Sequence, residues 1–279
     1  MDNAAAASTR VAVARRRIGT AQTVLATTFN ETREAAYARA TASKFGTYAN
    51  GMRERTVIHC FGDSHTRVYR RVRCQMRNIA LTTTTVRGAT AYGILNPDSK
   101  SGAGPRFAAA IGRISDRHAI LIQLGEVDCG SLLWRLADRR GTSVDELAKL
   151  SLNRYFMFLT ALDRSPLIIS GVTPPTVSDY TQFDGISNPR YGLTASWTDR
   201  MELTQEWNCR VRDWCSAEGH VYLDSFDLLL TVDRAAIRGM FLPASPSDHH
   251  LEPNAYASYL ASTALPRALE SWGALVRRV

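Results

Sequence analysis

Short apolar runs alternate with longer amphipathic segments along most of this chain. The runs have strand length and are rich in β-branched and aliphatic residues. They lie at 56–61, 81–86, 119–124, 166–170 and 220–226. Helical periodicity fills 64–77, 144–162 and 195–217, and a last helix is expected after Pro253, with a break at Pro266. Strands that alternate with helices predict βαβ units, and therefore an α/β fold with a parallel sheet covered on both faces.

Candidate site residues follow four of the expected strands. Each lies a few residues beyond the end of one strand: Ser64, Gly88, Asp128 and Thr173. The carboxyl ends of parallel strands meet at one edge of the sheet, and ligands bind beyond that edge. The order of the elements alone therefore predicts a functional site that gathers these residues.

The residues Gly62-Asp63-Ser64-His65-Thr66 directly follow the first strand. Asp63 is a preferred helix N-cap, so Ser64 is expected in the first turn of the next helix. A serine there exposes its hydroxyl beside backbone N–H groups that can stabilise an oxyanion. The same residues also suit an ordinary capped turn, so a catalytic role for Ser64 requires a base elsewhere in the chain.

The richest source of such a base is Ser247-Asp248-His249-His250-Leu251. A carboxylate two residues before a histidine can hold the Nδ1–H group and leave Nε2 for the serine proton. We therefore predict that His250 is the base and that Asp248 orients it, with His249 pointing away as a helix cap or a substrate contact. The alternative base is His249, whose adjacent Asp248 suits the geometry less.

These motifs resemble the conserved blocks of the SGNH (GDSL-like) hydrolases, a superfamily of esterases and acyltransferases on a flavodoxin-like sheet. Gly62–His65 is similar to the first block, and Arg87–Gly93 to the block whose first glycine supplies an oxyanion N–H. Gly125–Asp128 stands where the family has Gly-x-Asn-Asp, and Asp248–His250 where it has Asp-x-x-His. The resemblance covers roughly residues 56–265 and implies a three-layer flavodoxin-like fold.

The resemblance also implies roles for individual residues. Ser64, His250 and Asp248 would be catalytic, and the N–H groups of Ser64 and Gly88 would form the oxyanion hole. Other residues near these motifs are candidates for lining the site: Asp63, His65, Asp128, His249 and Tyr92.

The third block departs from the family pattern. Val127 replaces the asparagine whose side chain would be a further oxyanion donor, and losing one such donor typically costs about 10²- to 10³-fold in rate. Gly125-Glu126-Val127-Asp128-Cys129 resembles a divergent branch of the superfamily that occurs in proteins associated with bacterial surface polysaccharides.

The resemblance implies a serine esterase or deacetylase that acts on an acylated carbohydrate or a small ester. One alternative is a carbohydrate O-acyltransferase, in which a sugar hydroxyl replaces water as the acyl acceptor. The other is a non-catalytic glycan-binding module, which the missing donor at Val127 motivates. The sequence does not distinguish these three functions.

Composition narrows the remaining function classes. The net charge of +8 comes with no recognisable nucleic-acid module, so no specific nucleic-acid partner is expected. No apolar stretch approaches the roughly 20 residues of a membrane span. No ligand spacing for a metal is visible, so neither a metal nor a cofactor is expected. Five cysteines without a Cys-x-x-Cys motif fit a reduced, cytoplasmic compartment.

The N-terminal part of the chain differs from the rest. Residues 3–30 contain arginines but no acidic residue, a composition that resembles an organellar transit peptide. We expect 1–54 to form a basic, helical extension and 55–279 to form the hydrolase domain. The oligomeric state stays open.

Overall fold

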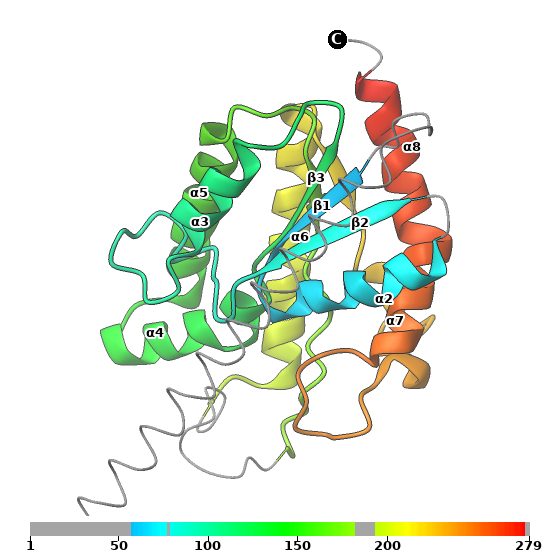
Figure 1. Cartoon of the computed structure of the whole chain (residues 1–279). Coiled ribbons are helices and arrows are strands. Elements are labelled where there is room, and N and C mark those ends of the chain that lie inside the picture. Colours follow the sequence, from blue (N-terminus) through cyan, green and yellow to red (C-terminus); the bar gives the residue numbers. More distant parts are fainter. Residues whose placement is uncertain (1–56, 77–78, 182–192, 277–279) are drawn as a thin grey trace, which may run out of the picture. The chain divides into compact units, whose positions relative to one another are not determined.

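The computed structural model describes residues 57–76, 79–181 and 193–276. Within this part of the chain, five parallel strands form one sheet in the order β2-β1-β3-β4-β5 (Figure 1). This is the strand order of the flavodoxin-like doubly wound folds. The strands are β1 (Val57–Gly62), β2 (Ala80–Thr85), β3 (Ala119–Gln123), β4 (Ile168–Ser170) and β5 (Val221–Leu223). The expected parallel α/β sheet is confirmed, whereas the predicted extension over 1–54 lies outside the described residues.

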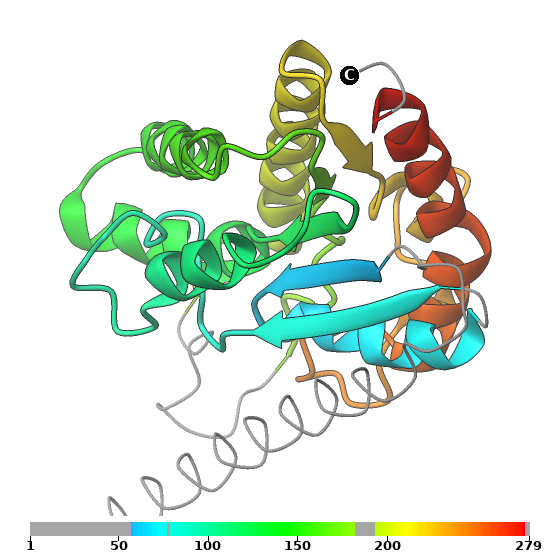
Figure 2. The ribbon, with the colours of Figure 1, turned by 45° about the horizontal axis from the view of Figure 1, so that its top comes forward.

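Helices cover both faces of the sheet (Figures 1 and 2). One face packs against α3 (Ala103–Ile111), α4 (Leu133–Arg140), α5 (Val144–Ala161) and α6 (Trp197–Ala217). The other packs against α2 (Val68–Gln75), α7 (Pro253–Tyr259) and α8 (Leu265–Val276).

The central strand β3 shows how the two cores divide. Ile120 and Ile122 point into the core beneath α3 and α5, and Leu121 points into the core beneath α2 and α8. Successive side chains of a strand point to opposite faces, and all five residues of β3 are buried. A strand buried on both faces appears in the sequence as a continuous apolar run rather than an alternating one.

Two helices, α3 and α4, were not expected. The segment that contains α3 has the glycines and proline of a loop, but Gly102 adopts a left-handed conformation (φ 55°) and leads into the helix. Pro105 occupies the first turn, where no intrahelical N–H donor is needed. Helix α4 is rich in arginine and buries only Leu133 and Leu136, so its apolar face is narrow.

The C-terminal helical region does not break at Pro266 as expected. Helix α7 leads through a π-helical turn, η5 (Leu260–Ala264), directly into α8, whose second residue is Pro266. A proline ring clashes with the carbonyl four residues earlier, and the wider π turn relieves that contact. The sequence therefore predicted correctly that the helix is irregular near Pro266, but the irregularity is a π-helical turn and not a break.

No helix among the described residues combines the length and the apolar character that crossing a membrane requires.

Candidate active site

Ser64 lies where β1 ends at the carboxyl edge of the sheet. Gly62 packs so closely on β3 that a Cβ atom there would lie 2.1 Å from the carbonyl oxygen of Gln123. The chain then turns into a 3-10 helix, η1 (Ser64–Arg67), which continues as α2. Asp63 caps this turn, because its Oδ1 accepts the backbone N–H of His65 at 2.9 Å. Ser64 is therefore the first residue of a capped helical turn.

His250 and Asp248 reach Ser64 from the loop between η4 (Gly239–Phe241) and α7. The Nε2 atom of His250 lies 2.9 Å from Ser64 Oγ, and its Nδ1 lies 2.8 Å from Asp248 Oδ1. The same carboxylate oxygen accepts the backbone N–H of His250 at 3.0 Å. An acceptor at Nδ1 favours the tautomer that carries its proton there, so that Nε2 presents a lone pair to the serine hydroxyl.

The electrostatics of this pair suit a neutral base. Burial lowers the pKa of His250, and the electrostatic influence of the His65 ring acts in the same direction, while Asp248 opposes both. Desolvation alone would raise the pKa of Asp248, but hydrogen bonds from the backbone and ring of His250 outweigh it and lower the pKa. The side chain of Asp248 is 48% exposed, so solvent screens part of its charge.

Contacts along the base loop fix its position. Thr176 Oγ1 donates to the carbonyl oxygen of Asp248 at 3.0 Å, and the N–H of Glu252 donates to the carbonyl oxygen of Phe241 at 2.8 Å. Leu251 is buried in the core beneath α2 and α7. The two ends of the loop are thus joined to each other, and its middle is held by Thr176, which is 72 residues away.

His65 is buried directly beneath this pair. Its Nδ1 lies 3.0 Å from Asp63 Oδ1, and its Nε2 lies 3.3 Å from the carbonyl oxygen of His249 and 3.5 Å from Glu126 Oε2. The ring is 4.6 Å from that of His250, measured between centroids. His65 and Asp63 therefore form a layer under the catalytic candidates rather than an exposed rim.

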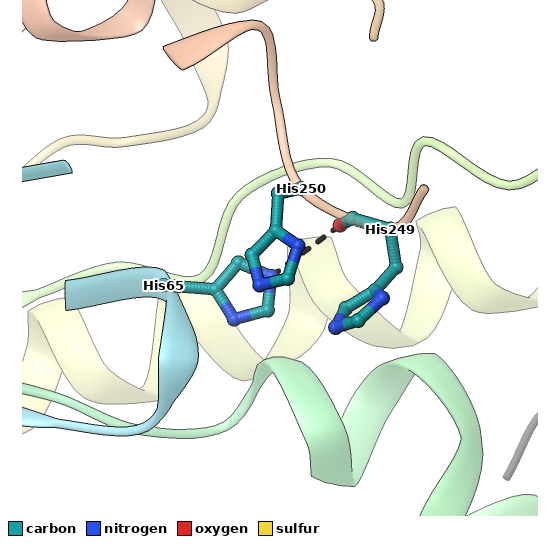
Figure 3. A group of neighbouring side chains, drawn as sticks. All are labelled: His65, His249 and His250. Atoms are coloured by element: carbon teal, nitrogen blue, oxygen red, sulfur yellow. Dashed lines mark hydrogen bonds between the residues drawn. The ribbon is translucent and has the colours of Figure 1, made fainter. Parts of the chain in front are cut away.

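His249 does not point away, so that expectation is wrong. Its ring centroid lies 4.0 Å from that of His250 and 5.4 Å from that of His65, so the three imidazoles form one cluster (Figure 3). The carbonyl oxygen of His249 lies over His65 Nε2, and this contact draws the residue inward.

Asp128 organises the loop after β2. It is fully buried, and its carboxylate accepts the backbone N–H groups of Ala91 and Tyr92 at 2.9 and 2.8 Å and the hydroxyl of Ser151 at 2.9 Å. Burial raises the pKa of Asp128 to about 6, against the lowering effect of these hydrogen bonds. Asp128 therefore positions the segment that carries Gly88.

The side chain of Tyr92 is held by arginines of α4 and α5. Its hydroxyl accepts a hydrogen bond from Arg140 at 2.8 Å, and the guanidinium carbon of Arg154 lies 4.5 Å from its ring centroid. These contacts give Tyr92 a packing role on the helix side of the loop.

The two candidate oxyanion donors follow neighbouring strands. The N–H of Val86 donates to the carbonyl oxygen of Gly62 at 2.9 Å, which brings the segment after β2 to the edge where Ser64 lies. Gly88 is exposed and has φ 69°, a left-handed conformation. Among the described residues, neither the Ser64 nor the Gly88 N–H donates a hydrogen bond, so both are available to a ligand.

Val127 is half-buried at the start of the helix that follows β3. Its aliphatic side chain offers no donor to an oxyanion. Its neighbour Glu126 is buried and lies near His65, which is a contact that sequence reasoning missed. For the pairing of His65 with Asp63 the sequence did hold a usable signal, because the pattern Asp-x-His occurs at 63–65 and again at 248–250.

The sequence matches no family model and no curated protein. Three solved structures with a similar backbone are enzymes by their names. A carbohydrate acetylesterase family member from Sinorhizobium meliloti is 13% identical, with 78% of this chain and 99% of that chain covered and a TM-score of 0.49. A GDSL-like lipase from Bacteroides thetaiotaomicron is 11% identical (83% and 96% covered, TM-score 0.48). An extracellular lipase from Streptomyces rimosus is 14% identical (78% and 99% covered, TM-score 0.43).

The strand order shows a doubly wound, flavodoxin-like α/β fold. In this chain the serine follows β1, the candidate oxyanion glycine follows β2, and the Asp-x-His segment precedes α7. At these identities the likeness concerns the fold alone.

Proposed function

We propose that this chain is a serine esterase that removes acyl groups, acetyl among them, from an acylated carbohydrate. The contact from Ser64 Oγ to His250 Nε2, at 2.9 Å, carries the proposal. A serine is a weak nucleophile until an adjacent base takes its proton, and that base must itself be oriented. Asp248, 2.8 Å from Nδ1, supplies the orientation.

Acylation follows from this arrangement. Ser64 Oγ attacks the ester carbonyl carbon as its proton passes to His250 Nε2, and Asp248 stabilises the resulting imidazolium. The carbonyl oxygen becomes an oxyanion, which accepts hydrogen bonds from the N–H groups of Ser64 and Gly88. When the tetrahedral intermediate collapses, the C–O bond to the sugar breaks, and His250 returns the proton to the departing sugar oxygen.

Deacylation repeats these steps with water. His250 takes a proton from a water molecule, whose oxygen attacks the acyl carbon on Ser64. Collapse of the second intermediate breaks the bond to Oγ, and the proton on Nε2 returns to the serine. The products are a carboxylic acid and free enzyme.

The carbohydrate part of the proposal rests on a separate observation. It depends on the resemblance of Gly125–Cys129 to a branch associated with surface polysaccharides. The name of the similar Sinorhizobium meliloti structure, a carbohydrate acetylesterase family member, agrees with it. An acyltransferase would share the first half-reaction and differ only in using a sugar hydroxyl in place of water.

Two specific tests follow. The first treats the full chain with a fluorophosphonate probe and measures the intact mass. We expect one adduct on the unchanged protein and none on Ser64→Ala or His250→Ala, whereas His220→Gln, outside the candidate site, retains labelling. Absence of an adduct, under conditions that label a known serine esterase, would contradict the esterase and favour the glycan-binding alternative, which Val127 motivates.

The second test supplies an acetylated glycan without any added acceptor. Acetate release that depends on Ser64 supports hydrolysis. Release that appears only when a sugar acceptor is added would show a transferase instead.

A further inference from the structure

Two copies of one local structure face each other across the candidate site. In Asp63-Ser64-His65, Asp63 Oδ1 accepts both the backbone N–H and the ring Nδ1–H of His65, at 2.9 and 3.0 Å. In Asp248-His249-His250, Asp248 Oδ1 accepts the same two groups of His250, at 3.0 and 2.8 Å. Histidines that bind metals almost always donate their other ring N–H to a carboxylate or carbonyl, which fixes the ring and increases its basicity. Both histidines are therefore prepared as Nε2 ligands.

The surroundings of His65 Nε2 call for a cation. With the proton on Nδ1, Nε2 carries a lone pair, yet two oxygens lie close to it, of His249 at 3.3 Å and of Glu126 at 3.5 Å. Three acceptors face one ring that has a single proton when neutral, so a further proton or a metal ion at Nε2 relieves the repulsion. The buried Oδ2 atom of Asp63 adds negative charge, since it has no hydrogen-bond partner among the described residues.

His249 completes a set of three imidazoles. One ring nitrogen from each of His65, His249 and His250 lies within 4.8 Å of those of the other two (Figure 3). Tetrahedral zinc with Zn–N bonds of about 2.0–2.1 Å requires these atoms to be roughly 3.3 Å apart. His249 is only half-buried on a loop, so its ring can close this gap by side-chain rotation while Asp63 and Asp248 hold the other two rings.

We propose that His65, His249 and His250 bind one divalent transition-metal ion of the zinc class. Imidazole nitrogens favour Zn²⁺ and its neighbours over Mg²⁺ or Ca²⁺, which prefer oxygen ligands. The carboxylates of Asp63 and Asp248 support two of the ligands, and the carboxylate of Glu126 adds to the local negative charge.

Binding of this ion opposes the proposed catalysis, a consequence that rests on the proposed function. The lone pair of His250 Nε2 that accepts the Ser64 proton is the one that coordinates the metal. Since one lone pair cannot serve both purposes, the metal-bound protein lacks its base. Zinc therefore acts as a reversible inhibitor whose removal by a chelator restores activity.

Calorimetric titration of Zn²⁺ into the full-length Ser64→Ala protein tests the site without any requirement for activity. We expect one ion per chain, with Mg²⁺ giving no signal. His249→Ala, added to this background, should weaken binding at least 10-fold, as is usual for a disturbed metal site. The matched control His220→Gln removes a histidine at the opposite edge of the sheet and should leave binding unchanged. His249→Gln is a second substitution that removes the ligand. Far-UV circular dichroism of each variant shows whether it is folded, so that ligand loss and misfolding can be told apart.

The outcomes distinguish this inference from the proposed function. Absence of saturable Zn²⁺ binding, or equal binding by the His249 variants and the His220 control, would overturn the metal site even if the esterase is active. Binding that depends on His249 in a protein without esterase activity would support the metal site and contradict only the proposed function. In an active protein, Zn²⁺ should abolish ester turnover and a chelator should restore it; turnover that persists at saturating Zn²⁺ would also overturn the site.

Discussion

At position 127 a valine side chain lies at the carboxyl edge of the sheet, close in sequence to Glu126 and Asp128. An asparagine at this position would add an N–H donor for the oxyanion. We expect Val127→Asn to raise kcat for an activated ester, by about 10-fold or more, because a single oxyanion donor typically contributes about 10²- to 10³-fold. Steady-state hydrolysis by the two proteins measures the difference.

Val127→Ala is the matched control for that substitution. It also removes the aliphatic side chain but brings no donor, so its kcat should not rise. An equal increase in both variants would show that steric relief, rather than a hydrogen bond to the oxyanion, limits the rate.

Individual site residues differed in how far the sequence could predict them. The proximity of Ser64, Asp248 and His250 was predictable, because a serine, a histidine and a carboxylate that act together need characteristic local neighbours, which the sequence shows. The inward position of His249 could not be predicted, because it depends on a contact between its carbonyl oxygen and His65, which is 184 residues away. Sequence spacing cannot reveal a cluster whose members come from two distant loops.

The turn from β3 into the following helix combines a left-handed backbone conformation with close packing. Gly125 has φ 119°, and a Cβ atom there would lie 2.7 Å from Val172 and 2.8 Å from the Trp207 indole nitrogen. We expect Gly125→Ala to lower the free energy of unfolding by about 3 kcal/mol or more, since backbone strain and overpacking each cost roughly 1–3 kcal/mol. Urea denaturation provides the measurement.

Gly141, at the C-terminus of α4, supplies the comparison. Its φ is 62°, but no atom lies within 4 Å of a Cβ built there. Gly141→Ala should therefore cost only the left-handed backbone preference, about 1 kcal/mol. Equal losses in the two variants would contradict the packing argument for Gly125.

The elements themselves were predictable where burial imposes a pattern. All five strands begin and end within three residues of their predicted positions. Strands such as β3, buried in a parallel sheet, must be apolar, and the threonine-rich edge strand β2 shows its β-branched composition instead. Helix α3 was missed since Gly102, Gly104 and Pro105 have the composition of a loop. Gly104 is required there by tertiary packing, because a Cβ atom would lie 2.0 Å from the carbonyl oxygen of Ile94.

On the scale of the whole molecule, Asp128 connects the loop after β2, the helix after β3 and α5 through one buried carboxylate. Its pKa is about 6 in the folded chain against 3.8 for the unconstrained group. Between these values the folded state holds a proton that the unfolded state has lost, so the free energy of unfolding falls as the pH rises. The fall is on the order of 3 kcal/mol for this group.

Asp128→Asn removes this titration. We expect the stability of the unchanged protein, relative to the variant, to be lower at about pH 7 than at about pH 4. Urea denaturation of both proteins at the two pH values checks this, because all other titrating groups are shared. A difference between the proteins that does not change with pH would place the pKa of Asp128 near its ordinary value.

Ser64, the proposed nucleophile, and His250, its proposed base, are 186 residues apart in the chain. All five strands are complete at Leu223, well before the base is reached. The residues directly after it, among them Leu251, Tyr256 and Leu260, are buried in the core beneath α7 and α8. A growing chain can therefore pair its strands while Ser64 still lacks its proposed base. Docking of the last helices both closes this core and brings His250 to Ser64, so under the proposed function the serine would become reactive only when these helices are in place.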